Sequence, residues 1–276
     1  MTSWQGKTIF MTGGSRGIGR AIALKMAAQG ANIVIAAKTD NPHPRLPGTV
    51  HSVAEEVRAA GGRCLPLVVD ARDEAQLVNA VAEAVEFFGG IDVLINNAGF
   101  LGLTPIANTS TKTYDLMQAL NTRSPFITMR ECLPHLQASR GAVLNLCPPI
   151  NLDPGWMGAF APYTVSKYGM TLLSMGYAEE TRRHGIQVAT LWPKTIIATD
   201  AVGAKMGDVG LSLSRKADIM ADAADLLLSQ RDKYQHQLSW LDEDVLRVSG
   251  VSDFDQYAHD PAKADQIQRD FYIGTF

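Results

Sequence analysis

The segment Thr12-Gly13-Gly14-Ser15-Arg16-Gly17-Ile18-Gly19 decides the fold, because it lies between a strand-like run and a helical one. The run before it, Lys7 to Thr12 (KTIFMT), is apolar and β-rich, and apolar residues recur every four positions from Gly17 to Gln29. Glycines at such a junction permit a tight turn and a close approach of the backbone to a ligand. The pattern predicts a β-turn-α unit that opens a parallel sheet.

The rest of the chain continues this alternation of short β-rich runs with longer helical patterns. Further strands are predicted at residues 31–37, 64–69, 91–96, 142–147, 186–192 and 236–241. Helices are predicted at 52–60, 73–88, 111–120, 124–138, 163–183 and 217–229, and Pro42, Pro44 and Pro47 mark a loop. The alternation predicts an α/β fold of the Rossmann type, a doubly wound parallel sheet of about seven strands with helices on both faces.

We expect a single domain over residues 1–244, because no internal repeat, linker or low-complexity segment interrupts the pattern. Beyond Asp244 the pattern weakens, and residues 245–276 are expected to form a C-terminal tail. Its aromatic residues predict that the tail packs on the same domain or on a neighbouring subunit.

The composition fits a folded α/β chain. Of the 276 residues, 46% are hydrophobic and 19% are charged, which excludes a disordered or fibrous protein. Lys and Arg number 25 and Asp and Glu number 28, so the net charge is -3 and a nucleic-acid partner is not expected. The low charge content and the aromatic tail predict a homodimer or homotetramer.

The cysteines and the N-terminal segment bear on the compartment. Cys64, Cys132 and Cys147 have unrelated spacings, which suits a reducing compartment rather than a disulfide framework or a zinc site. The segment before the first strand lacks the regions of a signal peptide, and no apolar run approaches the roughly 18 residues needed to cross a bilayer. None of the 6 histidines has metal-ligand spacing. We expect a cytoplasmic protein with no membrane span and no metal.

The glycine turn is a candidate phosphate site, because the free N–H groups and the positive dipole end of the following helix would face an anion. Its spacing is G-x-x-x-G-x-G rather than the common G-x-G-x-x-G, so the usual dinucleotide fingerprint does not transfer directly. A glycine-rich turn without a ligand is the alternative. The candidate cofactor-binding residues here are Gly13, Ser15, Arg16, Gly17, Ile18 and Gly19.

The end of the second strand bears on the choice of cofactor. An NAD site usually presents a carboxylate there to the ribose 2′-hydroxyl, about 20 residues after the turn, whereas a basic residue accommodates the 2′-phosphate of NADP. Here the strand ends Ala36-Ala37-Lys38. Lys38 and Arg16 therefore predict an NADP(H) site, the alternative being two solvated surface charges.

Three motifs, in this order, resemble those of the short-chain dehydrogenase/reductase family. They are the glycine turn, Asn96-Asn97-Ala98-Gly99 after the fourth strand, and Tyr163-Thr164-Val165-Ser166-Lys167. The resemblance covers the chain to about residue 244. Further stretches resemble a hydroxysteroid dehydrogenase-like subgroup, without the sterol-carrier domain of its longer members: Asn41-Pro42-His43-Pro44, Pro148-Pro149-Ile150-Asn151-Leu152 and Leu191-Trp192-Pro193-Lys194-Thr195.

The resemblance implies cofactor contacts beyond the glycine turn. The carboxylate after the third strand would contact the adenine, and the segment after the fourth strand would pass beneath the adenine ribose. Backbone and hydroxyl groups after the sixth strand would bind the nicotinamide carboxamide. The residues concerned are Asp70, Asn97, Ala98, Gly99, Pro193 and Thr195.

The resemblance also implies that Tyr163 is the proton donor or acceptor. Tyr163 and Lys167 are four apart, so a helix puts both on one face, where the ammonium would lower a tyrosine pKa that is ordinarily about 10. Lys167 would also hold the nicotinamide ribose, and Asn121 would hold a water that relays protons to the lysine. A surface pair of Tyr and Lys is the alternative.

The fifth strand departs from the family pattern, which normally ends there with a serine that polarises the substrate oxygen. Cys147 and Pro148 stand at and beside that place. Proline has no side-chain donor and a thiol is a weak one, so the hydrogen bond must come from elsewhere, such as Asn151 or a backbone N–H. Cys147 is read as a small buried hydrophobe and not as a nucleophile.

After the sixth strand the family's usual Pro-Gly is replaced by Pro193-Lys194. The segment from there to about Leu213, which contains Gly203, Gly207 and Gly210, is expected to form a mobile lid over the substrate. Apolar walls are expected from Trp156, Met157, Phe160 and Met206, the alternative being ordinary packing.

These features predict an NADP(H)-dependent oxidoreductase that interconverts a carbonyl and a secondary or primary alcohol on a small-to-medium apolar substrate. Hydride transfer would be coupled to proton transfer by Tyr163. The alternative is an NADP-binding pseudoenzyme or regulatory protein with little turnover, because Cys147-Pro148 occupies the serine place.

Overall fold

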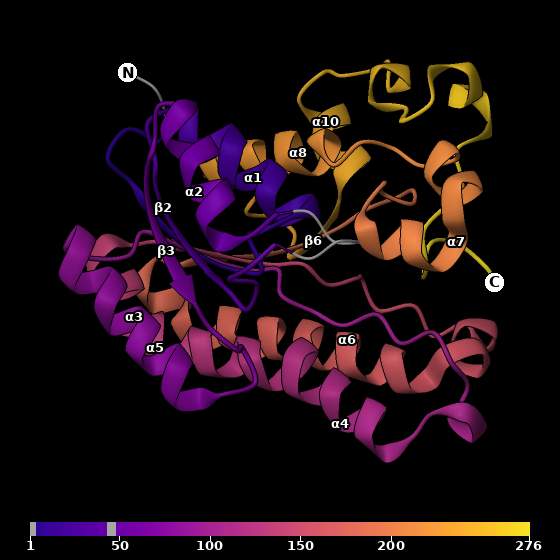
Figure 1. The fold of residues 1–276 in the computed structure, drawn as a ribbon, viewed down its shortest axis with the longest axis horizontal. Helices are drawn as coiled ribbons and strands as arrows, with labels where there is room; N and C mark the ends of the chain where they lie inside the picture. Colours follow the sequence, from indigo (N-terminus) through magenta and orange to yellow (C-terminus); the bar gives the residue numbers. More distant parts are fainter. Residues whose placement is uncertain (1–3, 43–47) are drawn as a thin grey trace.

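The computed structural model describes residues 4–42 and 48–276, and it shows one twisted sheet between two layers of helices (Figure 1). The strands are all parallel and lie in the order β3-β2-β1-β4-β5-β6-β7. Their bounds are β1 (Thr8–Thr12), β2 (Asn32–Ala37), β3 (Arg63–Val68), β4 (Val93–Asn96), β5 (Ala142–Asn145), β6 (Gln187–Trp192) and β7 (Ser239–Leu241). The predicted doubly wound Rossmann-type fold is confirmed.

Helices follow the strands along the chain. The α-helices are α1 (Gly17–Ala27), α2 (Val50–Ala59), α3 (Glu74–Phe88), α4 (Thr111–Gln118), α5 (Ser124–Ser139), α6 (Pro154–Thr181), α7 (Asp200–Ser212), α8 (Asp218–Ser229), α9 (Arg231–Tyr234) and α10 (Asp242–Val248). A π-helical turn, η2 (Ala119–Arg123), joins α4 to α5. Short 3₁₀ turns are η1 (Ile106–Asn108), η3 (Arg182–His184), η4 (Asp255–Tyr257) and η5 (Pro261–Gln266).

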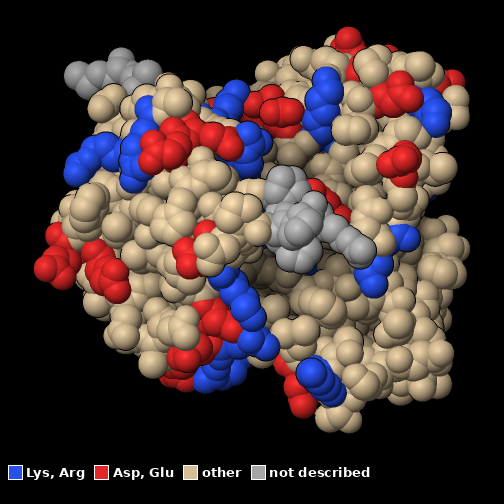
Figure 2. Space-filling model, viewed as in Figure 1, with Lys and Arg blue, Asp and Glu red and all other residues tan. Residues whose placement is uncertain are grey.

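The apolar side chains of the central strands alternate between two cores. In β1, Ile9 and Met11 pack with α1, α2 and α8 on one face, whereas Phe10 packs with α3 and α5 on the other. Every residue of β1, β2, β4 and β5 is buried, as expected of strands covered on both sides. On the face drawn in Figure 2, basic and acidic side chains are interspersed, in keeping with the net charge of -3.

Three predicted elements differ from the structure. The helix expected at 163–183 begins at Pro154, because Asp153 caps it by accepting a hydrogen bond from the Gly155 N–H at 2.8 Å. The same helix bends at Phe160. The expected lid is the helix α7, interrupted at Gly207. The weak pattern after residue 244 did not predict α10, which continues to Val248. Pro44 and Pro47, predicted to mark a loop, lie outside the described residues.

The C-terminal tail runs beside the loop that follows β6. Thr195 and Arg269 form an antiparallel bridge, and the Ile196 N–H donates to the Gln268 carbonyl at 3.0 Å. Tyr272, only 2% exposed, enters an aromatic cluster that contains Trp156 and Phe160. The tail therefore lies at the carboxyl end of the sheet, where loops of parallel strands bind ligands.

Within the described ranges, each helix is too short or too polar to cross a lipid bilayer.

Candidate nucleotide and substrate site

Two adjoining cavities lie at the carboxyl ends of the strands. One, of about 500 Å³, follows β1, β2, β3 and β4 and is called here the glycine-turn cavity. The other, of about 250 Å³, lies between β4, β6, α6 and α7 and is called the tyrosine cavity. Residues that line both are Ile18, Asn97, Gly99, Thr199 and Ala201. A larger groove, between α1, α7 and α8, contains neither Tyr163 nor Lys167.

Most of the predicted cofactor residues line these cavities. Those in the glycine-turn cavity are Gly13, Ser15, Arg16, Gly17, Ile18, Lys38, Asp70, Asn97, Ala98 and Gly99. Tyr163, Lys167 and Pro193 line the tyrosine cavity. Gly19, Asn121 and Thr195 lie behind the lining. The structure thus brings together motifs that are far apart in the sequence.

The glycine turn packs directly against the segment after β4. Gly13 has a φ of +74°, and a Cβ atom there would lie 2.8 Å from the Ala98 backbone nitrogen and Cα. Asn97 Nδ2 donates to the Gly13 carbonyl at 2.7 Å, and Thr12 Oγ1 accepts hydrogen bonds from the Asn97 and Ala98 N–H groups. Only glycine combines this left-handed backbone with so close an approach.

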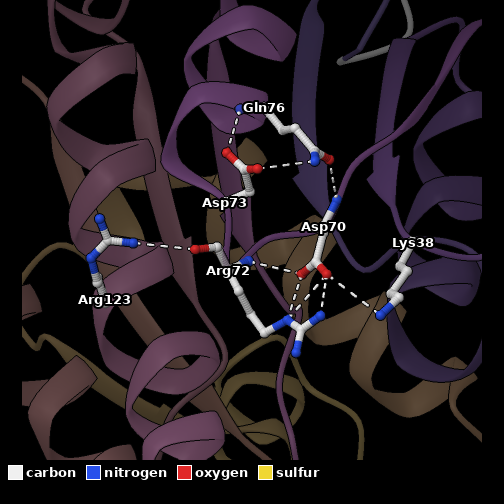
Figure 3. Close-up of polar contacts among 6 residues, drawn as sticks. All are labelled: Lys38, Asp70, Arg72, Asp73, Gln76 and Arg123. Carbon is white, nitrogen blue, oxygen red and sulfur yellow. Dashed lines mark hydrogen bonds and ion pairs between the residues drawn. The ribbon is translucent and has the colours of Figure 1, made fainter.

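The acidic residue after β3 is paired with cations (Figure 3). Asp70 accepts hydrogen bonds from the guanidinium of Arg72, and Lys38 Nζ lies 3.4 Å from its Oδ2. The Arg72 hydrogen bond holds the pKa of Asp70 well below its usual range. Its carboxylate is thus paired with protein cations at the edge of the cavity, and the adenine contact implied by the resemblance stays a prediction.

Two basic side chains beside Lys38 complete the rim of the glycine-turn cavity. Arg16 donates to Thr39 Oγ1 at 2.6 Å, which holds its guanidinium near the end of β2. Arg72 lines the same cavity and was not predicted. Its position two residues beyond Asp70 could have suggested it, because a short loop after β3 lies next to the end of β2.

Tyr163 and Lys167 lie one helical turn apart on α6, as predicted, and both are buried. Lys167 Nζ donates to the Leu146 carbonyl at 2.8 Å and lies 5.4 Å from the centre of the Trp192 ring. Burial lowers the pKa of Lys167 to about 8. Burial also raises the pKa of Tyr163, so the expectation that Lys167 lowers it is wrong for this structure.

Asn121 lies in the π-helical turn η2, whose wider winding directs its side chain between β4 and α6. Its Oδ1 accepts from the Phe100 N–H at 2.9 Å, and its Nδ2 donates to Ser166 Oγ at 2.9 Å. A Cβ atom on Gly99 would lie 3.0 Å from Asn121 Oδ1 and 3.7 Å from Lys167 Nζ, so the two groups lie against the same glycine. The water relay stays a prediction.

The place of the family serine holds no donor for the cavity. Cys147 is wholly buried, lies outside both cavity linings, and burial raises the pKa of its thiol to about 11. Asn151, named above as a substitute donor, is engaged elsewhere, since its Nδ2 donates to the Tyr272 and Gly274 carbonyls at 2.9 and 2.7 Å. That suggestion is wrong, because the amide fastens the tail.

In the segment after β6, Lys194 has a structural role. Lys194 donates its N–H to Asp242 Oδ1 at 2.9 Å, and its Nζ lies 3.2 Å from Glu243 Oε2. These contacts fasten the segment to the start of α10. Next to it, Thr195 Oγ1 is buried without a hydrogen-bond partner among the described residues, which suits an incoming polar group such as a carboxamide.

The apolar walls of the tyrosine cavity differ from the expected ones. Met206 lines it, but Trp156, Met157 and Phe160 belong to the aromatic cluster that holds the tail. The other large apolar residues of the lining include Phe100, Leu101, Leu103, Trp192, Ile196 and Phe271. Asp270 and Phe271 come from the tail, and the weak pattern of that region gave no reason to place them at this site.

Comparison with known proteins agrees with this arrangement of motifs. A family model described as short chain dehydrogenase matches residues 7–208. The chain belongs to the short-chain dehydrogenase/reductase family. The chain is 50% identical over 269 residues to hydroxysteroid dehydrogenase-like protein 2 of Danio rerio, covering 97% of this chain and 64% of that protein. The human protein of that name is 46% identical over 273 residues, with 98% and 64% covered. The chain thus spans less than two thirds of the length of these relatives.

Solved structures extend the comparison. A putative dehydrogenase from Xanthomonas campestris superposes with a TM-score of 0.90 at 42% identity, covering 99% of this chain and 98% of that one. A metagenomic short-chain oxidoreductase in complex with NADP has a TM-score of 0.69 at 27% identity, with 87% and 97% covered. An NADH-dependent reductase, A1-R′, complexed with NAD has a TM-score of 0.71 at 27% identity, with 87% and 96% covered. The family fold therefore binds either nucleotide.

Proposed function

We propose that the chain is an NADP(H)-dependent oxidoreductase that interconverts a carbonyl and an alcohol on a small-to-medium apolar substrate. The observation that carries the proposal is the placement of Tyr163 and Lys167 in an apolar cavity that adjoins the glycine-turn cavity. One molecule that occupies both can reach from the cations beside β2 to the tyrosine. The predicted roles of the other site residues belong to this proposal.

The preference for NADP(H) rests on the cations of the glycine-turn cavity. Arg16, Lys38 and Arg72 all line it, and Asp70, the carboxylate that follows β3, is paired with two of them. A ribose 2′-phosphate would meet basic donors there, whereas a 2′-hydroxyl would lack its usual free carboxylate. One solved relative is in complex with NADP and another with NAD, so the proposed preference rests on these side chains.

The chain fits the nucleotide at both ends. At the glycine turn, a Cβ atom on Gly13 would fill the space next to Ala98, so glycine keeps this turn open to a pyrophosphate. At the other end, the Thr195 hydroxyl, which has no partner among the described residues, suits the carboxamide. The cofactor, when bound, supplies or accepts the hydride. Lys167 would hold the ribose and maintain a positive charge near the reacting oxygen, while Pro193 would shape the pocket for the ring.

Tyr163 is set up as a proton donor. Its raised pKa keeps the phenol protonated at neutral pH, so it can give a proton to the oxygen of a carbonyl that is being reduced. Lys167, with a pKa of about 8, is mostly charged at pH 7 and stabilises the resulting phenolate. Leu101, Leu103 and Met206 give the cavity apolar walls. The protonated phenol is therefore the form that serves reduction at neutral pH.

We also propose a homodimer or homotetramer. Phe126 on α5 and Val165, Leu172 and Met175 on α6 are between 46% and 60% exposed, which is unusual for side chains of this size on one layer of helices. Light scattering from the purified chain would reject this arrangement if only a monomer is found.

The pseudoenzyme alternative has no supporting observation, since Tyr163, Lys167 and Asn121 are all retained and brought together. Titration of the purified chain with NADPH and NADH, followed by fluorescence, tests the cofactor. Loss of NADPH absorbance with apolar ketones and aldehydes tests the reaction. NADPH-preferring binding with turnover is expected, and binding without turnover in either direction across the panel would contradict the enzymatic proposal.

A further inference from the structure

Asp270 is a buried carboxyl group of the tail that reaches the tyrosine cavity. It is 8% exposed and lines the same cavity as Tyr163 and Lys167. The remaining walls are largely apolar, with Phe100, Leu103 and Ile197 among them. A carboxyl group in such surroundings is costly unless it has a specific partner or remains neutral.

The position of Asp270 is fixed by backbone pairing with the loop after β6. Its N–H donates to the Lys194 carbonyl at 3.1 Å, and the preceding residue, Arg269, bridges Thr195. On the other side, the carbonyl of Phe271 accepts from Trp192 Nε1 at 3.2 Å. The carboxyl group is therefore held beside the cavity on a rigid segment rather than on a free end.

One oxygen of Asp270 is left for a ligand. Oδ1 accepts from the Phe271 N–H at 2.6 Å, whereas Oδ2 has no hydrogen-bond partner in the described part of the chain. Nor does the hydroxyl of Tyr163 bond to any described group, although Lys167 Nζ donates to Leu146. Among the described residues that line the cavity, the Tyr163 hydroxyl and Asp270 Oδ2 are therefore both available to a substrate oxygen.

We propose that Asp270 is a catalytic residue that donates a hydrogen bond from its carboxylic acid to the substrate carbonyl oxygen, in the function that the absent serine would serve. This inference rests on the proposed carbonyl-reductase function of the same cavity. The Asp270 proton stays on the carboxyl group, while Tyr163 gives its own proton to the same oxygen. A preorganised donor at this point stabilises the charge that develops on that oxygen.

The protonation state required for this role agrees with the surroundings. Burial raises the pKa of Asp270 to about 8, opposed by its Phe271 hydrogen bond and the positive charge of Lys167, so the acid form prevails at pH 7. Asp242 on α10 raises it further, and its own pKa is raised to about 7. The other ionisable groups facing Asp270 are Tyr163, Tyr272 and, across the cavity, Lys205.

The first test compares Asp270→Asn and Asp270→Ala with the wild-type chain, with decanal as the probe substrate. Asparagine keeps an N–H donor and the acceptor for Phe271, so kcat/KM should stay within about fivefold. Alanine should lower kcat/KM by about 10²-fold, as for loss of one donor to a developing oxyanion. The NADPH affinity should be unchanged in both. Asp265→Asn, at an exposed tail position, is the matched control.

The pH profile separates catalysis from a structural role. In the wild type, kcat/KM for reduction should fall above pH 8 with the loss of two protons, because Asp270 and Lys167 titrate in the same range. Asp270→Asn should lose only one. If Asp270 has only a structural role, the pH profile of kcat/KM in Asp270→Asn should be the same as in the wild type, which would overturn the proposal. Wild-type activity in Asp270→Ala would also overturn it.

A measurement that does not need turnover keeps this inference distinct from the proposed function. The infrared carbonyl band of bound 2-decanone should lie at lower frequency in the wild type than in Asp270→Ala, because the hydrogen bond weakens the C=O bond. If no ketone or aldehyde turns over but this difference is present, the reductase proposal fails and Asp270 still binds the carbonyl. Equal frequencies, or no band from bound ketone, would contradict the role of Asp270.

Discussion

The glycine-turn cavity and the tyrosine cavity adjoin each other but are built differently. In the first, most lining residues belong to short motifs that follow β1, β2, β3 and β4, and each motif supplies several neighbours. In the second, Tyr163 and Lys167 come from α6, Met206 from α7 and Asp270 from the tail. The nucleotide end is thus encoded locally, whereas the substrate end is assembled from distant segments.

This difference follows from what each end must recognise. A pyrophosphate needs backbone N–H groups at a helix N-terminus, which one turn can provide. An apolar substrate needs enclosing walls and a few placed polar groups, which loops and a tail can vary without disturbing the sheet. Changes at the substrate end should therefore alter turnover, and changes at the nucleotide end should alter affinity.

The largest effect is expected at the substrate end, from Lys167→Met. Loss of the ammonium beside Tyr163 should lower kcat/KM by about 10³-fold, within the range of a proton-transfer group, while NADPH affinity falls less than about tenfold. Kinetics and fluorescence titration on the same preparation check this. Lys112→Met, at an exposed position of α4, is the control. A larger loss of NADPH affinity than of kcat/KM would contradict the assignment of Lys167 to the substrate end.

At the nucleotide end, Gly13→Ala should weaken NADPH binding about tenfold or more. The new Cβ atom lies 2.8 Å from Ala98 in a left-handed backbone, a strain of about 1–3 kcal/mol that also lowers the free energy of unfolding. Isothermal titration and urea unfolding measure the two effects. Gly158→Ala, where the added atom meets nothing within 4 Å, should have neither. Equal NADPH affinities and equal free energies of unfolding in the two variants would contradict the role given to Gly13.

Removal of one cation should change the cofactor preference more than the total binding. Lys38→Ala should lower NADPH affinity about tenfold, the value of one charge-assisted hydrogen bond, and leave NADH affinity nearly unchanged. The ratio of the two dissociation constants is the readout, with Lys112→Ala as the control. A parallel loss for both nucleotides would show that Lys38 does not recognise the 2′-phosphate.

The smallest effect is expected where the tail meets α6. Tyr272 shares a buried hydrogen bond with Thr164 Oγ1 at 3.1 Å, so Tyr272→Phe should lower the free energy of unfolding by about 1 kcal/mol. Thermal unfolding measures this, with Tyr114→Phe on α4 as the control. No loss of stability would mean that this hydrogen bond does not help to hold the tail.

The sequence predicted the glycine turn and the Tyr163-Lys167 pair because strand, turn and helix impose fixed spacings on neighbouring residues. It also predicted that Cys147 is buried and inert. It could not place Arg72 beside Lys38, because that contact depends on the pairing of β2 with β3. Nor could it predict Asp270, whose position depends on the pairing of residues 268–271 with the loop after β6.

Two errors have the same physical origin. Asn151 and Trp156 were expected to serve the substrate, but both bind the tail, through carbonyls at Tyr272 and Gly274. The pKa of Tyr163 was expected to be lowered by a neighbouring ammonium, but its burial dominates. In each case the deciding neighbour or environment comes from a segment whose place the local pattern does not specify.

The central claim is that the tyrosine cavity performs proton transfer on a substrate held beside NADPH. The most direct test is the loss of NADPH absorbance with decanal at saturating NADPH, in the wild type and in Tyr163→Phe. We predict that the variant binds NADPH as tightly as the wild type but consumes it at least about 10²-fold more slowly. Equal rates of consumption would contradict the account.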